Sequence, residues 1–333
     1  MASIGHKFTT IIKLLKVFDT RLDQLEDWLE IFFDDANFTI SKASDDASFR
    51  RYFRIERSNL SFIAMDAPPD KENSEIFVKI AKLLRLNGIY APKIIDQDLQ
   101  QGFLLIEDLG SITFLQALDK ANTLNLYRMA IDELIKLQTI DWHKQGLNHY
   151  DESLLKAELQ LLVEWYLPKN IEQPLLNQLH QLFNELVQNS LNSPQVFVHR
   201  DYHCRNLMIT NSKLSVIDFQ DAVVGSNSYD LVSLLKDAYY ELETSELHTL
   251  LTDYHTQAKI AISFNEFEKQ FDLMGLQRHL KILGIFKRLS IRDGKHQYLK
   301  DIPLIEKYVL QIADKYPNFI YLKDIINLTK VDQ

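Results

Sequence analysis

The sequence predicts an α+β fold with two lobes, a small strand-rich lobe followed by a larger helical lobe. Short alternating or clustered apolar segments dominate the first third of the chain, which is typical of strands. After residue 110 the apolar residues recur at helical spacing, and one strand-like stretch, 195–218, interrupts them. The length of 333 residues exceeds the usual size of one domain and allows two lobes.

The first third of the chain carries the signals for one sheet and two helices. Helical spacing predicts helices over 22–33 and 75–86, and Gly88 is a typical stop after the second. Alternating or clustered apolar residues predict strands over 38–40, 52–56, 60–65, 93–96 and 103–106. We place the boundary between the lobes after Glu107, so that the two domains span 1–107 and 108–333.

Further helices are predicted in the rest of the chain. Apolar residues at 124, 127, 131, 134 and 135 share one face of a long helix, and helical spacing also covers 153–166 and 174–191. At the N-terminus, lysines interrupt the apolar run over 11–18, which favours an amphipathic helix over a signal-peptide core.

Composition and charge restrict the class of protein. Hydrophobic residues make up 46% of the chain and charged residues 25%, as in ordinary soluble globular proteins. The net charge of -9 would repel a phosphate backbone, so we expect no nucleic-acid partner. No apolar run approaches the roughly 20 residues that span a bilayer, so no membrane partner is expected either. The single cysteine, Cys204, excludes an internal disulfide and fits the cytoplasm.

A β-hairpin is predicted where two apolar runs, 207–210 and 214–217, flank a turn-forming Asn-Ser-Lys. Pairing centred on Ser212 would place Asn206 opposite Asp218. Both side chains would then project from the open end of the hairpin. An amide oxygen and a carboxylate are hard oxygen ligands of the kind that Mg²⁺ takes while it keeps waters and substrate phosphates.

The loop before the hairpin adds a third polar group, Asp201, which remains free to accept a proton. A metal held against phosphates and a carboxylate that orients and deprotonates a hydroxyl are the parts that phosphoryl transfer needs. The motif His199-Arg200-Asp201, four residues, Asn206, and then Asp218-Phe-Gln resembles the catalytic core of the aminoglycoside phosphotransferase family within the protein-kinase-like superfamily.

This resemblance implies a bilobal protein-kinase-like fold, with ATP and Mg²⁺ as cofactors. It makes Asp201 the catalytic base and Asn206 and Asp218 the magnesium ligands. It also implies that backbone groups of the hinge, at Glu107 and Leu109, contact adenine.

A narrower resemblance extends along nearly the whole chain. The segments 44–52, 65–69, 218–222 and 277–281, with Arg-Asp-Gly-Lys at 292–295, look like those of the anomeric sugar kinases. That bacterial group phosphorylates N-acetylmuramate and N-acetylglucosamine at the anomeric hydroxyl in peptidoglycan recycling. The resemblance therefore implies a small-molecule amino-sugar substrate.

The nucleotide site departs from the protein-kinase pattern. No Gly-x-Gly-x-x-Gly loop is present, and Met65 stands on the strand that carries the phosphate-binding Lys in protein kinases. We expect the turn around Ser48 to offer backbone N–H groups to the phosphates, with Arg51 adding charge. Other cations compete for this role, namely Arg50, Arg54, Lys71 and Lys79.

Several residues have two interpretations. His199 and His203 with Cys204 mimic zinc-ligand spacing, although the kinase motif already explains His199. Asp230 could bond the backbone of the catalytic loop or simply cap a helix. The basic residues near the end of the chain form a solvated helix face or bind the lactyl carboxylate of muramate, and the candidates for the second role are Arg278, Lys281 and Arg292.

Competing functions also remain at this stage. An aminoglycoside or other metabolite phosphotransferase would share the fold, and a pseudokinase would bind nucleotide without turnover. The complete set of Asp201, Asn206 and Asp218 argues against a pseudokinase. The segment 225–230 is too short for a long activation loop, which argues against a protein kinase.

Overall fold

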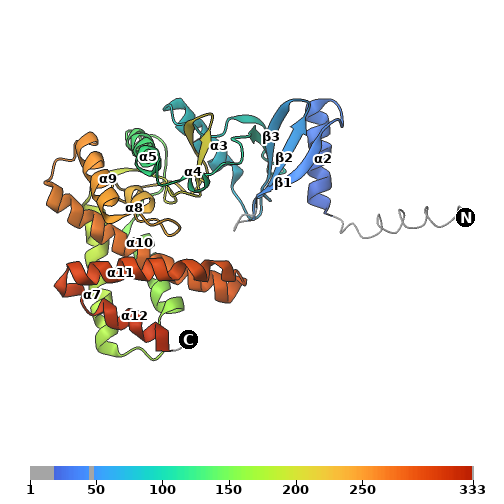
Figure 1. Ribbon diagram of the computed structural model, residues 1–333. Helices are drawn as coiled ribbons and strands as arrows, with labels where there is room; N and C mark the ends of the chain where they lie inside the picture. Colours follow the sequence, from blue (N-terminus) through green and yellow to red (C-terminus); the bar gives the residue numbers. More distant parts are fainter. Residues whose placement is uncertain (1–18, 45–48, 332–333) are drawn as a thin grey trace, which may run out of the picture. The chain divides into compact units, whose positions relative to one another are not determined.

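The computed structural model describes residues 19–44 and 49–331, which form two compact units (Figure 1). The first unit comprises the described residues up to 78 together with 93–108, and the second comprises 79–92 and the described residues from 109 onward. A sheet dominates the first unit and helices dominate the second, which confirms the predicted α+β fold class.

Three of the expectations for the fold remain predictions. The predicted helix at 11–18 and the turn residue Ser48 lie outside the described residues. The boundary after Glu107 stays a prediction. The second compact unit contains 79–92 as well as the described residues from 109 onward, so one boundary in the sequence cannot separate the two units.

The first unit contains a five-stranded antiparallel sheet with strand order β1-β2-β3-β5-β4. All five predicted strands are present, with bounds that differ slightly from those expected. They are β1 (Thr39–Ser44), β2 (Arg51–Arg57), β3 (Leu60–Asp66), β4 (Ile94–Asp98) and β5 (Phe103–Glu107).

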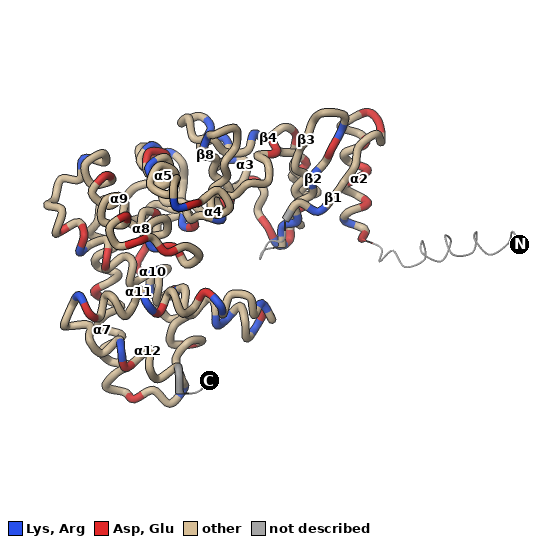
Figure 2. Tube along the Cα trace, viewed as in Figure 1, with Lys and Arg blue, Asp and Glu red and all other residues tan. Residues whose placement is uncertain are grey.

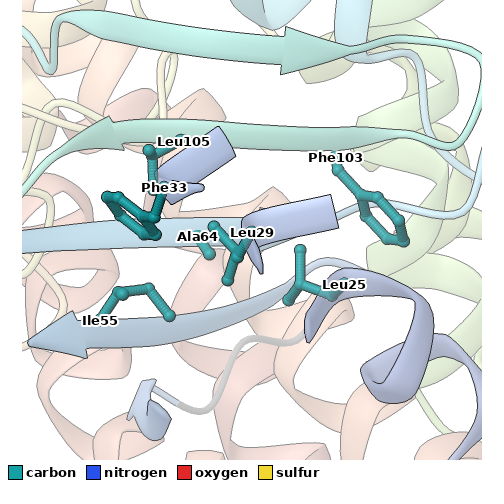
Figure 3. Close-up of a cluster of buried hydrophobic side chains, with 7 residues drawn as sticks. All are labelled: Leu25, Leu29, Phe33, Ile55, Ala64, Phe103 and Leu105. Carbon is teal, nitrogen blue, oxygen red and sulfur yellow. The ribbon is translucent and has the colours of Figure 1, made fainter. Parts of the chain in front are cut away.

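Helix α2 (Thr20–Phe33) supplies one side of the core of this unit (Figure 3). Asp19 caps the helix by accepting a hydrogen bond from the Leu22 N–H at 3.1 Å. Leu25, Leu29 and Phe33 follow at four-residue intervals, so they share one face. They form one buried cluster with side chains of the sheet, namely Ile55, Ala64, Phe103 and Leu105.

Helix α3 (Ser74–Leu86) ends as the sequence predicts. Gly88 adopts a φ of +76°, which a glycine tolerates without steric cost. The Ile89 N–H then donates to the Leu84 carbonyl at 3.0 Å and the Gly88 N–H to the Arg85 carbonyl at 3.1 Å. These bonds satisfy carbonyls at the end of the helix and turn the chain towards β4.

The second unit is built from helices. Its earlier helices are α4 (Phe114–Ala117), α5 (Thr123–Gln138), α6 (Glu152–Leu161) with the π-helical turn η2 (Leu162–Tyr166), α7 (Gln173–Asn192) and α8 (Tyr229–Leu235). The later ones are α9 (Thr244–Gln257), α10 (Phe264–Asp293), η3 (His296–Asp301), α11 (Ile302–Lys315), η4 (Pro317–Phe319) and α12 (Leu322–Val331). The three predicted helices of this region correspond to α5, to α6 with η2, and to α7.

Helix α10 is the central element of the second unit. It has 30 residues and packs against α6, η2, α7, α8 and α11, with α11 alongside it in Figure 1. A capping box at Ser263 begins the helix, and Gly294 ends it with a φ of +66°. A Cβ on Gly284 would lie 2.4 Å from the Leu161 backbone carbon, so this glycine permits the close approach of α6.

The second unit also contains two short two-stranded sheets. β6 (Gln195–Val198) pairs with β9 (Val223–Ser226), a strand that the sequence did not predict. β7 (Leu207–Thr210) and β8 (Lys213–Val216) form the predicted hairpin.

The register of this hairpin differs from the prediction by one residue. Asn211 and Ser212 have φ values of +50° and +63°, so the turn has two residues and Lys213 pairs with Thr210. Consequently the backbone of Asn206 bonds Ile217 rather than Asp218, with the Ile217 N–H donating to the Asn206 carbonyl at 3.0 Å.

The distribution of charge does not form blocks. Figure 2 shows acidic and basic residues interspersed along both units, without a long run of one sign in the described chain. Among the described helices, none has the length and apolar character needed to cross a membrane.

Candidate active site

The loop that follows β6 is held by a buried carboxylate. Asp230, in the first turn of α8, accepts hydrogen bonds from the backbone N–H groups of His199 at 2.6 Å and Arg200 at 3.0 Å. This is the architectural role that was one of the two interpretations of Asp230. Arg200 itself has a φ of +76°, a conformation that a non-glycine residue keeps when its surroundings impose it.

His199 fixes the same loop from the inside. Its Nδ1 accepts from the Asp201 N–H at 3.3 Å, and its Nε2 lies 3.0 Å from the Ile217 carbonyl. Burial lowers the pKa of His199 to about 4, so the ring is neutral and Nε2 carries the proton. Among the described residues, no three His, Cys, Asp or Glu side chains are placed to hold a metal ion together. Both ring nitrogens of His199 already have hydrogen-bond partners, which favours the explanation of His199 by the kinase motif over the zinc interpretation.

Asn206 connects the loop to the segment after the hairpin. Its Nδ2 donates to the Asp201 carbonyl at 3.1 Å and to Asp218 Oδ2 at 3.1 Å. Gln220, for which the sequence indicated no separate role, donates from Nε2 to Asp218 Oδ1 at 2.8 Å. Asp218 has a φ of +64°, and this turn brings its carboxylate to Asn206 in spite of the shifted register.

The residues present fit a magnesium ion. Each Asp218 oxygen accepts an amide hydrogen bond, and a carboxylate oxygen has lone pairs for more than one partner, while Asn206 bonds Asp218 through its nitrogen and not through its oxygen, the atom type that Mg²⁺ prefers. One carboxylate and one amide oxygen suit Mg²⁺, which usually completes its coordination with water and substrate phosphates.

The Asp201 carboxylate is partly accessible, with 45% of its side chain exposed. Arg278 Nη2 lies 3.6 Å from Asp201 Oδ1. Desolvation by the surrounding protein would raise the pKa of Asp201, but the nearby cations, first Arg278 and then others including Lys281, outweigh it and lower the pKa below its ordinary value. The carboxylate is therefore ionised at neutral pH.

Two of the basic residues predicted for substrate binding, Arg278 and Lys281, are buried on α10. Lys281 Nζ contacts Glu158 Oε1 and the Tyr229 hydroxyl, each at 3.0 Å. The third, Arg292, is exposed and pairs with its neighbour Asp293 at 2.7 Å. The structure thus groups the first two with the loop of Asp201 and leaves Arg292 outside that group.

Sequence analysis missed the acidic partner of this group, Glu158 on α6. Arg200 Nη2 lies 2.6 Å from Glu158 Oε1, and the Tyr150 hydroxyl donates to the other carboxylate oxygen. Burial would raise the pKa of Glu158, but Lys281 and Arg200 outweigh this and lower it. A single glutamate on an amphipathic helix carries no local sequence signal, so only the packing of α6 on α10 reveals it.

The residues predicted to contact the nucleotide, where the structure describes them, have hydrogen-bond partners within the protein. Arg51 on β2 bonds Asp66 Oδ2 at 2.9 Å and Asp19 Oδ1 at 3.2 Å, so its guanidinium is engaged within the first unit. The Glu107 N–H donates to the Lys93 carbonyl at 2.9 Å. The Leu109 carbonyl accepts from Thr210 Oγ1 at 2.6 Å. Their assignment to ATP stays a prediction, as does that of Ser48.

Solved structures with the same fold include small-molecule kinases and phosphotransferases. An ethanolamine kinase from Plasmodium vivax aligns over 91% of this chain and 94% of its own, with a TM-score of 0.65 and 12% identity. An ADP-bound aminoglycoside phosphotransferase aligns over 85% of this chain and 96% of its own, with a TM-score of 0.57 and 17% identity. At these identities the likeness defines the fold, and it confirms the predicted protein-kinase-like class.

Sequence relatives specify the family. Residues 39–263 match the model of the phosphotransferase enzyme family, and the chain belongs to that family. It is 40% identical to the N-acetylmuramate/N-acetylglucosamine kinase of Pseudomonas aeruginosa, with 92% of this chain and 96% of the relative covered. Membership of the family confirms the predicted enzyme class, and this relative confirms the resemblance to the anomeric sugar kinases.

Proposed function

We propose that this protein is an ATP- and magnesium-dependent kinase that phosphorylates the anomeric hydroxyl of N-acetylmuramate and N-acetylglucosamine. The observation that carries the proposal is the 40% identity, over 92% of the chain, to a relative named for those two sugars. The product would be a sugar 1-phosphate, which suits a cytoplasmic role in cell-wall recycling.

Asn206 and Asp218 are the residues we assign to Mg²⁺, which when bound neutralises charge on the ATP phosphates. Gln220 supports this assignment, because its amide bonds the other Asp218 carboxylate oxygen than Asn206 does and so restrains the direction of the carboxylate. For adenine we assign the backbone of Glu107 and Leu109. Arg51 would need to exchange its carboxylate partners to reach a phosphate.

Asp201 is the group we assign to the acceptor hydroxyl. Its pKa is held low, so it is a weak base whose main contribution is to orient the hydroxyl and accept its proton late. That suits a loose transition state, in which little negative charge develops on the attacking oxygen before phosphoryl transfer. An anomeric hydroxyl is more acidic than the other ring hydroxyls, so a weak base suffices.

An active enzyme is favoured over a pseudokinase, because the three side chains that phosphoryl transfer requires are all present and Asn206 contacts both the Asp218 carboxylate and the backbone carbonyl of Asp201. Fold alone does not decide between an amino sugar and an aminoglycoside as acceptor. We therefore test the acceptor with a panel of amino sugars and aminoglycosides, with ATP and Mg²⁺, and monitor ADP release. The proposal predicts turnover with the two N-acetyl sugars, and turnover with aminoglycosides alone would contradict it.

A further inference from the structure

Arg278 connects α10 to the loop that carries Asp201. Its Nη1 donates to the Arg200 carbonyl at 2.8 Å and to the Tyr229 hydroxyl at 3.1 Å, and its Nη2 lies 3.6 Å from Asp201 Oδ1. The side chain is buried. One guanidinium thus contacts both the backbone and the carboxylate at the proposed reaction centre.

The backbone at Arg200 requires restraint from its surroundings. Its φ of +76° is disfavoured for a residue with a side chain, so the surrounding structure has to hold it. Asp230 accepts a hydrogen bond from the Arg200 N–H, and Arg278 donates one to the Arg200 carbonyl. Because Asp201 is the next residue, the direction of its side chain depends on both restraints.

Arg278 is itself fixed by a buried network, because the Tyr229 hydroxyl to which it donates also accepts a hydrogen bond from Lys281. Lys281 and the guanidinium of Arg200 share the carboxylate of Glu158, at 3.0 Å and 2.6 Å. Glu158 therefore faces two of the three cations, and the third, Arg278, faces Asp201. An arginine with this set of internal partners is preorganised and has little freedom to turn towards a substrate.

We infer that Arg278 is a positioning residue, which holds the Arg200–Asp201 turn in the conformation that presents Asp201 to the acceptor and does not bind the acceptor itself. This inference rests on the proposed function for the identity of the acceptor. It replaces the expectation that Arg278 binds the lactyl carboxylate of muramate.

The two sugars provide the decisive comparison, since N-acetylmuramate has the lactyl carboxylate and N-acetylglucosamine lacks it. For Arg278→Gln and the milder Arg278→Lys we expect kcat to fall equally for both sugars, by about 100-fold in the glutamine variant, with little change in KM. A loss confined to N-acetylmuramate, with raised KM, would overturn the inference. So would an unchanged kcat for both sugars.

A double-variant cycle separates positioning from general damage to the fold. If Arg278 acts through Asp201, then Arg278→Gln should cost almost nothing further in an Asp201→Ala background. Losses that multiply would indicate an independent structural effect and contradict the inference. Arg128→Lys is the matched control, because Arg128 makes a half-exposed ion pair with Asp253 at 2.9 Å on the surface of the same unit.

Two further measurements keep the inference testable if a variant is unstable or the acceptor differs. Tyr229→Phe removes the hydroxyl that orients Arg278 and should lower kcat on both sugars in the same proportion. Hydrogen exchange of the loop 199–206 needs no acceptor, and Arg278→Gln should speed it at least about tenfold if the loop loses its restraint. Unchanged exchange would overturn the inference, whereas inactivity of the wild type on both sugars would overturn the proposed function alone.

Discussion

Asp201 and Asp218 are both carboxylates of one small region, and their different neighbours suit them to the two different tasks that we propose for them. Asp201 faces the Arg278 guanidinium at 3.6 Å and is partly exposed, which suits a group that meets an acceptor. Asp218 is held by amide groups of Asn206 and Gln220, at 3.1 Å and 2.8 Å, which suits a metal ligand of fixed direction. The two tasks should separate in mutants.

Asp201→Ala is expected to lower kcat by about 10³-fold while the binding of magnesium ATP stays nearly unchanged, because we assign this carboxylate to the acceptor and not to the nucleotide. Asp218→Ala should weaken nucleotide binding in the presence of Mg²⁺. Steady-state kinetics and calorimetric titration of the nucleotide measure the two effects. Asp132→Ala, an exposed carboxylate on α5, is the control. Near wild-type turnover of Asp201→Ala would remove Asp201 from the role of base.

Buried neutral histidines make the fold sensitive to acid. Burial lowers the pKa of His199 to about 4 and that of His279 to about 3, whereas both would titrate near 6.5 in the unfolded chain. The unfolded state therefore takes up protons first as the pH falls. The free energy of unfolding therefore falls as the pH drops from 6.5 to about 4, and the protonation of His199 accounts for roughly 3 kcal/mol of this loss.

The prediction can be checked by chemical denaturation at a series of pH values. His279→Gln should show a shallower loss of the free energy of unfolding below pH 6.5 than the wild type, because one proton uptake is removed. Identical pH profiles for the two proteins would show that His279 does not contribute.

The candidates for the phosphoryl-transfer site could be proposed from the sequence because their chemistry and spacing lie within one short stretch, and the structure brings Asn206 into contact with Asp218 and with the backbone of Asp201. Arg278 and Lys281 were noticed for a different reason, because they are charged residues within an otherwise apolar helical segment. Their partners could not be predicted, since a basic residue has the same local pattern whether it faces water or a buried glutamate.

At the level of elements, local patterns were sufficient to locate α2, α3, α5, α6 and α7 and the strands of the first sheet. The hairpin was also predicted, but its register was shifted because two residues in the left-handed conformation, Asn211 and Ser212, form a tighter turn than Asn-Ser-Lys suggested. Strand β9 was missed because its partner, β6, lies before the catalytic loop, so their pairing is not local in sequence.

Gly284 provides a test of how α10 meets α6. A Cβ there would lie 2.4 Å from the Leu161 carbon, a backbone atom that cannot simply rotate away. Gly284→Ala should therefore destabilise the protein by about 1 to 3 kcal/mol, measured by chemical denaturation. Gly275→Ala is the matched control on the same helix, since its Cβ would make ordinary contacts at 3.7 Å. An unchanged or higher free energy of unfolding for Gly284→Ala would contradict the described packing.

At the scale of the whole molecule, the fold is compatible with many acceptors. The solved structures that share it include proteins named for ethanolamine and for aminoglycosides, so the two-unit architecture cannot identify the acceptor. Our proposal for the acceptor rests instead on the 40% identity, over 92% of this chain, to a relative named for two amino sugars. The central claim is accordingly about one hydroxyl group of one class of sugar.

The most direct test compares N-acetylglucosamine with its methyl glycoside, which retains the acetamide and every hydroxyl except the anomeric one. With ATP and Mg²⁺, we expect ADP release with the free sugar and none with the glycoside, because the group that Asp201 would orient is blocked. The product from the free sugar should release phosphate in mild acid, as glycosyl phosphates do. Phosphorylation of the methyl glycoside at a comparable rate would contradict the account and point to another hydroxyl as the acceptor.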